Sequence, residues 1–135
     1  MSNIIKELKY EHMMIYRLLS GLRDLDGGPE EVRKLLLSAK KRIMEHVRKE
    51  DARLYPALRK AAGRDKALLE KLDQLAGDMS DTTAELEKFF IKYSKSGPRG
   101  NFVEDLNSLY TLIKERLQKE EMYLFPEYSA ITGKR

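Results

Sequence analysis

The sequence predicts an all-α protein: an antiparallel up-down-up-down four-helix bundle that forms a single domain over residues 1–135. Apolar residues recur with helical periodicity along most of the chain, no segment reads as a strand, and the breaks between the helical runs are short. The chain has 135 residues and no cysteine, so it can bury a core but cannot use disulfides. Ligand sites of such bundles lie in the core, so polar residues on the inner faces are the candidates.

The first helix is expected to end at Gly27-Gly28, and Pro29 suits the first position of the second helix. Pro56 is predicted to kink or end the second helix, and Gly63 to close it. The two inner faces consist of residues that recur three or four positions apart: Ile4, Ile5, Leu8, His12, Ile15, Leu18, Leu19 and Leu22 in the first helix, and Val32, Leu35, Leu36, Ala39, Ile43, His46, Val47 and Leu54 in the second.

Asp65 is predicted to cap the third helix, and residues 94–100 form the longest loop segment. Asn101 is predicted to cap the fourth helix with Glu104 in a reciprocal capping box, and Pro126 repeats the kink of the second helix. The inner faces are Leu68, Leu69, Leu72, Leu75, Met79, Leu86, Phe89, Phe90 and Tyr93 in the third helix, and Leu106, Leu109, Tyr110, Leu112, Ile113, Arg116, Leu117, Glu120 and Leu124 in the fourth.

A segment of the second helix recurs seventy residues later in the fourth. Residues 46–56 read HVRKEDARLYP and residues 116–126 read RLQKEEMYLFP, so Lys-Glu, an acid, Leu, an aromatic residue and Pro keep the same order. The first copy begins with His46 and the second with Arg116. The repeat indicates two related helical hairpins, of which one has kept a metal-ligand pair that the other has partly lost.

Both histidines of the chain, His12 and His46, fall on predicted core faces. Glu50 lies one helical turn after His46, and Glu120 takes the equivalent place in the repeat, so two imidazoles and two carboxylates are expected at one level of the bundle. Such ligands suit iron, manganese or zinc. A core histidine is more often only hydrogen-bonded, and an acidic pair is usually at the surface; the duplication and the shared inward phase favour the metal.

With these motifs the chain resembles the hemerythrin-like (HHE cation-binding) domain over nearly its whole length. The resemblance rests on the EHMMI segment around His12 and on the two repeated motifs that end in Leu-Tyr-Pro and Leu-Phe-Pro. It implies a non-haem di-iron centre and an association with oxygen binding or sensing, nitric-oxide or iron-related stress, and iron handling. It also implies that His12, His46, Glu50 and Glu120 are metal ligands.

The chain departs from the family pattern at two ligand positions. The pattern has a histidine in the third helix and another at the head of the fourth-helix motif, where this chain has Thr83 and Arg116. Met79 is an alternative to Thr83 if the register of the third helix is shifted by one turn. In the family these two histidines serve the second iron, so the resemblance implies one complete half-site here.

Arg116 is expected to stand in for the second cation and to pair with Glu50 and Glu120, or else to extend its charged head to solvent. We therefore predict a cofactor of one metal ion, iron with zinc or manganese as alternatives. Two ions, or a site held by salt bridges without any metal, remain as further alternatives.

The predicted function is a cation-binding protein of the hemerythrin type, in oxygen, nitric-oxide or redox sensing or in metal handling, with O2 or NO as the small ligand. The alternative is a metal-free descendant that acts as a structural or partner-binding regulatory module. No nucleophile–base pair is apparent, so we do not expect an enzyme. We expect a cytoplasmic location, since the chain has neither a signal peptide nor an apolar run long enough for a membrane. The net charge of +4 comes from interleaved charges, which do not predict nucleic-acid binding.

Overall fold

The computed structural model describes residues 3–24, 28–94 and 100–132, and over these ranges the chain forms four helical rods without any strand. The all-α bundle predicted from the sequence is therefore confirmed. The first rod is α1 (Asn3–Asp24) and the third is α4 (Lys66–Ser94). The second comprises α2 (Pro29–Lys49), a π-helical turn η1 (Glu50–Leu54) and α3 (Tyr55–Ala62), and the fourth repeats this order as α5 (Phe102–Lys119), η2 (Glu120–Leu124) and α6 (Phe125–Thr132).

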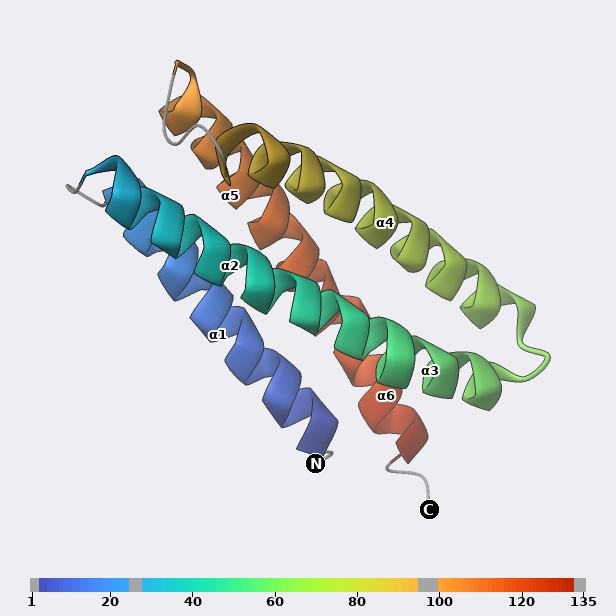
Figure 1. The fold of residues 1–135 in the computed structure, drawn as a ribbon. Helices are drawn as coiled ribbons and strands as arrows, with labels where there is room; N and C mark the ends of the chain where they lie inside the picture. Colours follow the sequence, from blue (N-terminus) through green and yellow to red (C-terminus); the bar gives the residue numbers. More distant parts are fainter. Residues whose placement is uncertain (1–2, 25–27, 95–99, 133–135) are drawn as a thin grey trace.

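The rods form a four-cornered bundle in which neighbours along the chain run in opposite directions (Figure 1). α1 packs against α2 and α5, α4 packs against the same two helices, and α3 packs against α4 and α6. The described ends of the chain lie at the same end of the bundle as the turn between α3 and α4 (Figure 1). Within the described ranges, no helix combines the length and the apolar character needed to cross a bilayer.

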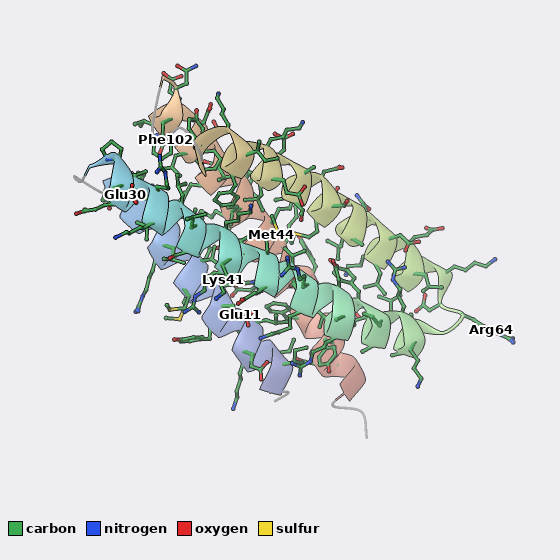
Figure 2. All side chains as sticks on the ribbon, in the orientation of Figure 1. Glu11, Glu30, Lys41, Met44, Arg64 and Phe102 are labelled. Atoms are coloured by element: carbon green, nitrogen blue, oxygen red, sulfur yellow. The ribbon has the colours of Figure 1, made fainter. Side chains whose placement is uncertain are left out.

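A polar layer divides the core into two apolar clusters. One cluster lies near the α1–α2 end and includes Ile15, Ile43 and Leu117, and the other includes Leu8, Leu54 and Leu124. Side chains from all four rods fill the space between the helices (Figure 2). The buried polar residues lie between the two clusters along each rod: His12, His46, Glu50, Thr82 and Glu120. Since burial of a charge is costly without a partner, this polar layer is the candidate functional site.

Both repeated motifs contain a π-helical turn, which the sequence did not reveal. Proline has no N–H and its ring collides with the carbonyl four residues earlier, so an α-helical turn before Pro56 or Pro126 is disfavoured. The chain widens instead: the N–H of Tyr55 donates to the carbonyl of Glu50, and that of Phe125 to the carbonyl of Glu120. The rods thus continue through the predicted kinks, and each wide turn begins at a buried glutamate.

The predicted helix caps are confirmed in part. The Leu68 N–H donates to Asp65 Oδ1 at 3.2 Å, as expected of a capping aspartate. Asn101 also holds the N-cap position of α5, but its side chain makes no capping bond. Its backbone carbonyl accepts from the Asp105 N–H at 2.8 Å, so the main chain alone closes this first turn, and the predicted capping by the Asn101 side chain is wrong.

Gly63 ends α3 in a conformation that other residues rarely adopt, with φ of 57° and ψ of −108°. Its N–H donates to the Arg59 carbonyl at 3.3 Å. No atom would clash with an added Cβ, so a substitution there costs backbone strain alone. We expect Gly63→Ala to lower the free energy of unfolding by about 1–3 kcal/mol. Urea denaturation measures the effect, and Gly77→Ala, inside α4 with equally open space, is the control.

Candidate metal centre

The four residues singled out in the sequence meet in the polar layer. His12 comes from α1, His46 from α2, Glu50 from η1 and Glu120 from η2, so three rods contribute. Each of the four is at most 3 % exposed. One ligand atom from each residue lies within 4.8 Å of those of the other three. The structure thus brings together all four residues that the sequence predicts as ligands.

The inner nitrogen atoms of the two imidazoles point at each other and at Glu120. The two Nε2 atoms are 3.1 Å apart, and Glu120 Oε1 lies 2.8 Å from Nε2 of His12 and 3.3 Å from that of His46. Glu50 Oε1 is 3.5 Å from His46 Nε2. Four electron-rich atoms therefore surround one point.

The outer ring nitrogens fix which way the imidazoles present their lone pairs. His12 Nδ1 lies 2.8 Å from Glu121 Oε2, and His46 Nδ1 lies 2.7 Å from Glu11 Oε1. A carboxylate only accepts, so each Nδ1 carries a proton and donates it. In the neutral ring the Nε2 lone pair then faces the centre, which is the form that binds a metal.

Such a convergence of ring nitrogens and carboxylate oxygens favours positive charge at its centre, from protons on the imidazoles or from a cation. Both oxygens of Glu50 and Oε2 of Glu120 are buried without a hydrogen-bond partner. Buried polar atoms are seldom left unpaired because each one costs about 1–3 kcal/mol. The donor set and these orphaned oxygens fit one cation with nitrogen and oxygen ligands.

The protonation pattern of the four residues shows how the layer balances its charge without a cation. Burial alone would lower the pKa of His46, but its hydrogen bonds to Glu11 and Glu120 and the nearby charge of Glu50 raise it to about 12. Burial and the nearby Glu120 charge raise the pKa of Glu50 well above its ordinary value. Burial opposes ionisation of Glu120 as well, yet the bonds from His12 and His46 lower its pKa. In the absence of a metal ion, bound protons therefore offset the negative charge of the carboxylates.

Arg116 is directed toward α4 rather than toward the carboxylates of the layer. Its Nε donates to Thr82 Oγ1 at 2.8 Å, and its Nη1 lies 3.3 Å from Asp78 Oδ2. The expected pairing of Arg116 with Glu50 and Glu120 is therefore wrong, and its carboxylate partner is Asp78. The physical reason is that Asp78 offers a half-exposed carboxylate, so the guanidinium is paired without being fully desolvated.

Thr82, and not Thr83, is the α4 residue that faces Arg116. Thr82 is 3 % exposed and lines a small cavity of about 20 Å3 together with Met79, Arg116 and His46. Thr83 is half-buried and donates to the Met79 carbonyl at 2.9 Å, on a side of α4 that faces a separate surface cavity. The predicted register placed Thr83 opposite His12, but the α4 residue in the polar layer is Thr82, one position earlier.

Sequence reasoning missed the two carboxylates that hold the imidazoles. Glu11 directly precedes His12, and Glu121 directly follows Glu120. Each is adjacent along the chain to one predicted ligand but bonds a different one, on another helix. The only clue in the sequence is that each glutamate is next to a predicted ligand. Many surface glutamates also neighbour a core-facing residue, so this clue does not identify them.

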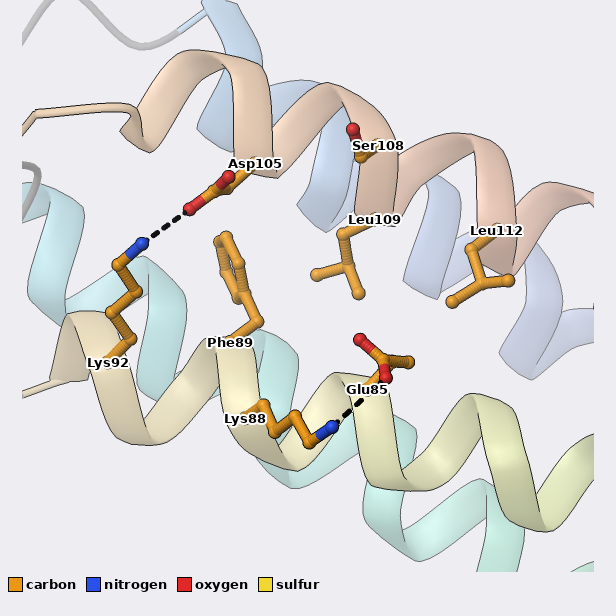
Figure 3. A pocket seen from close by; sticks show the side chains of 8 residues that line it. All are labelled: Glu85, Lys88, Phe89, Lys92, Asp105, Ser108, Leu109 and Leu112. Carbon is orange, nitrogen blue, oxygen red and sulfur yellow. Dashed lines mark hydrogen bonds and ion pairs between the residues drawn. The ribbon is translucent and has the colours of Figure 1, made fainter.

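The open pocket between α4 and α5 plays no part in this centre. It has a volume of about 260 Å3, and its wall includes Phe89 and Leu109. Figure 3 shows the ion pairs at its rim, Lys92–Asp105 at 3.0 Å and Lys88–Glu85 at 3.3 Å. None of the residues that line it belongs to the polar layer, so we do not regard it as part of the metal site.

Comparison with known proteins agrees with this geometry. No curated protein and no solved structure matches the chain. The family pattern of the hemerythrin HHE cation-binding domain matches residues 3–128, which include the four converging residues and both repeated motifs. The chain therefore belongs to the hemerythrin HHE cation-binding domain family.

Proposed function

We propose that this protein binds one metal ion through His12, His46, Glu50 and Glu120. The observation that carries the proposal is the buried convergence of four ligand atoms, one from each residue. Three of the four carboxylate oxygens of Glu50 and Glu120 also lack any hydrogen-bond partner. Iron is the preferred ion, and zinc and manganese are alternatives that the same donors suit. Among the described residues four protein ligands converge, so an iron ion would keep open positions for a small ligand such as dioxygen or nitric oxide.

The role proposed for such a site is sensing of oxygen, nitric oxide or redox state, or handling of the metal itself. The chain's own residues determine what the ion would experience: two neutral imidazoles oriented by Glu11 and Glu121, and two carboxylates buried in an apolar surrounding. The apolar clusters on either side of the layer limit access of water. We propose binding and not a catalytic reaction.

A second candidate is a metal-free module that binds a partner protein. It is favoured by the contacts of Arg116 with Thr82 and Asp78, since these residues occupy the side of the layer where the family pattern has two further histidines. Under this reading the proton-bridged layer is a structural remnant, and loss of His12 would leave the response of the protein to metals unchanged.

Metal titration of the protein separates the two candidates. We expect about one equivalent of zinc or ferrous iron per chain, measured by calorimetry and by elemental analysis after gel filtration. Because metal and protons compete for the same lone pairs, each proton released should strengthen the apparent affinity about tenfold per pH unit. Titrations at pH 6.5 and 7.5 in two buffers of different ionisation enthalpy count these protons. A folded protein that binds no metal would overturn the proposal and favour the second candidate.

A further inference from the structure

The two carboxylates that hold the imidazoles cross between the rods. α1 carries the ligand His12 and, next to it, Glu11, which bonds His46 of α2. The fourth rod carries the ligand Glu120 and, next to it, Glu121, which bonds His12 of α1. Each of these rods therefore provides one converging atom and also sets the ring orientation of a ligand on a neighbour.

The surroundings of the two carboxylates differ. Glu11 is 20 % exposed, and its other oxygen contacts the Lys49 ammonium, which also lies 3.5 Å from Glu7. Glu121 is 39 % exposed, and among the described residues it forms no ion pair with a lysine or arginine. It forms part of the wall of an open depression of about 600 Å3 that Tyr16, Tyr110 and Lys114 also line. The charge of Glu11 is thus offset by a direct ion pair with Lys49, whereas Glu121 has no such pair with a lysine or arginine in the described part of the chain.

We propose that Glu11 and Glu121 are positioning residues of unequal strength, a statement that rests on the metal site proposed above. Both hold an imidazole with its Nε2 lone pair toward the ion. Glu121, which has no such ion pair among the described residues, raises the donor strength of His12 more than Glu11 raises that of His46. His12 is then the ligand whose bond to the ion responds most to its surroundings, because its partner is reached from the open depression.

The test compares Glu11→Gln and Glu121→Gln with Glu115→Gln as the control. Glu115 is an exposed glutamate of α5 and lines no described cavity. The zinc affinity should fall about 10–100-fold in the two test variants, with the larger fall for Glu121→Gln, and should be unchanged in the control. Cobalt(II) is the second probe, and its visible absorption bands should shift further in Glu121→Gln than in Glu11→Gln.

The ring N–H resonances of the metal-free protein supply a readout that needs no metal. Glu121→Gln should move the Nδ1–H signal of His12, and Glu11→Gln that of His46, in a 15N-labelled sample. Shifts in these signals without metal binding by the wild type would reject the metal site while keeping the two hydrogen bonds. Wild-type zinc affinity and cobalt spectra in both folded variants would overturn the proposal itself, as would equal effects of the two changes. A variant that loses its helical circular dichroism is replaced by its aspartate counterpart.

Discussion

Replacing Glu50 with glutamine is expected to stabilise the metal-free protein and to abolish most of its metal affinity. Glu50 is 1 % exposed and neither of its oxygens has a hydrogen-bond partner. Glutamine has the same shape but stays neutral without binding a proton, so it places no second negative charge beside Glu120. The free energy of unfolding at pH 7 should therefore rise by about 1–3 kcal/mol. Losing one of four ligands should cost about 3 kcal/mol of zinc binding, roughly 100-fold in affinity.

The pH dependence of this stabilisation has a definite sign. Because the pKa of Glu50 is raised above 4.5 by burial and by Glu120, the folded state binds its proton more tightly than the unfolded state does. The wild type therefore loses stability relative to Glu50→Gln as the pH rises above about 4.5, and the difference vanishes below that value. Thermal unfolding of metal-free samples from pH 4 to pH 8 measures it.

The matched control for this change is Glu45→Gln, which removes an exposed carboxylate from the same rod. It should leave both stability and zinc affinity close to those of the wild type. If Glu50→Gln instead destabilised the metal-free protein and kept its zinc affinity, Glu50 would be a structural acceptor and not a ligand.

Restoring two imidazoles at positions 82 and 116 is expected to create a second metal site. Thr82 and Arg116 face each other across α4 and α5, with Arg116 Nε 2.8 Å from Thr82 Oγ1. Arg116→His removes a fixed positive charge that would repel a second cation, and with Thr82→His it adds two nitrogen donors. The second oxygens of Glu50 and Glu120, unbonded in this structure, would be available to the second ion. The metal content should rise from about one to about two equivalents per chain.

The single variants are the controls for this experiment, because each supplies only one new imidazole. Both should bind about one equivalent of metal. The pair Thr83→His with Arg116→His is a register control: Thr83 lies on another side of α4, so this pair should also bind only one. A folded Thr82→His, Arg116→His protein with one equivalent would show that the two positions do not reach a common ion.

The four converging residues could be predicted because helical periodicity and the internal repeat together place them. His46 and Glu50 are one helical turn apart, Glu120 holds the matching place in the repeat, and His12 falls on the apolar face of the first helix. Periodicity fixes which face a residue lies on, and the repeat fixes the level along the bundle. Together these two constraints were enough to bring the side chains to one point.

The contacts around the site could not be predicted in the same way. On α4 no motif marks the level, and an error of one residue turns a side chain by about 100°, which separates Thr83 from Thr82. The long Arg116 side chain reaches Asp78 on another helix, and nothing in the sequence selects that carboxylate over Glu50 or Glu120. Glu11 and Glu121 were missed because their partners lie on other rods.

α4 is the one rod that contributes no converging atom to the centre. A bound ion would stabilise the packing of α1, the second rod and the fourth rod against one another. It would not directly stabilise the packing of α4 against them. α4 is held by its apolar face, by the contacts of Arg116 and by ion pairs such as Lys92–Asp105. Local opening of the loaded protein should therefore begin there, which makes α4 the natural moving part of this fold.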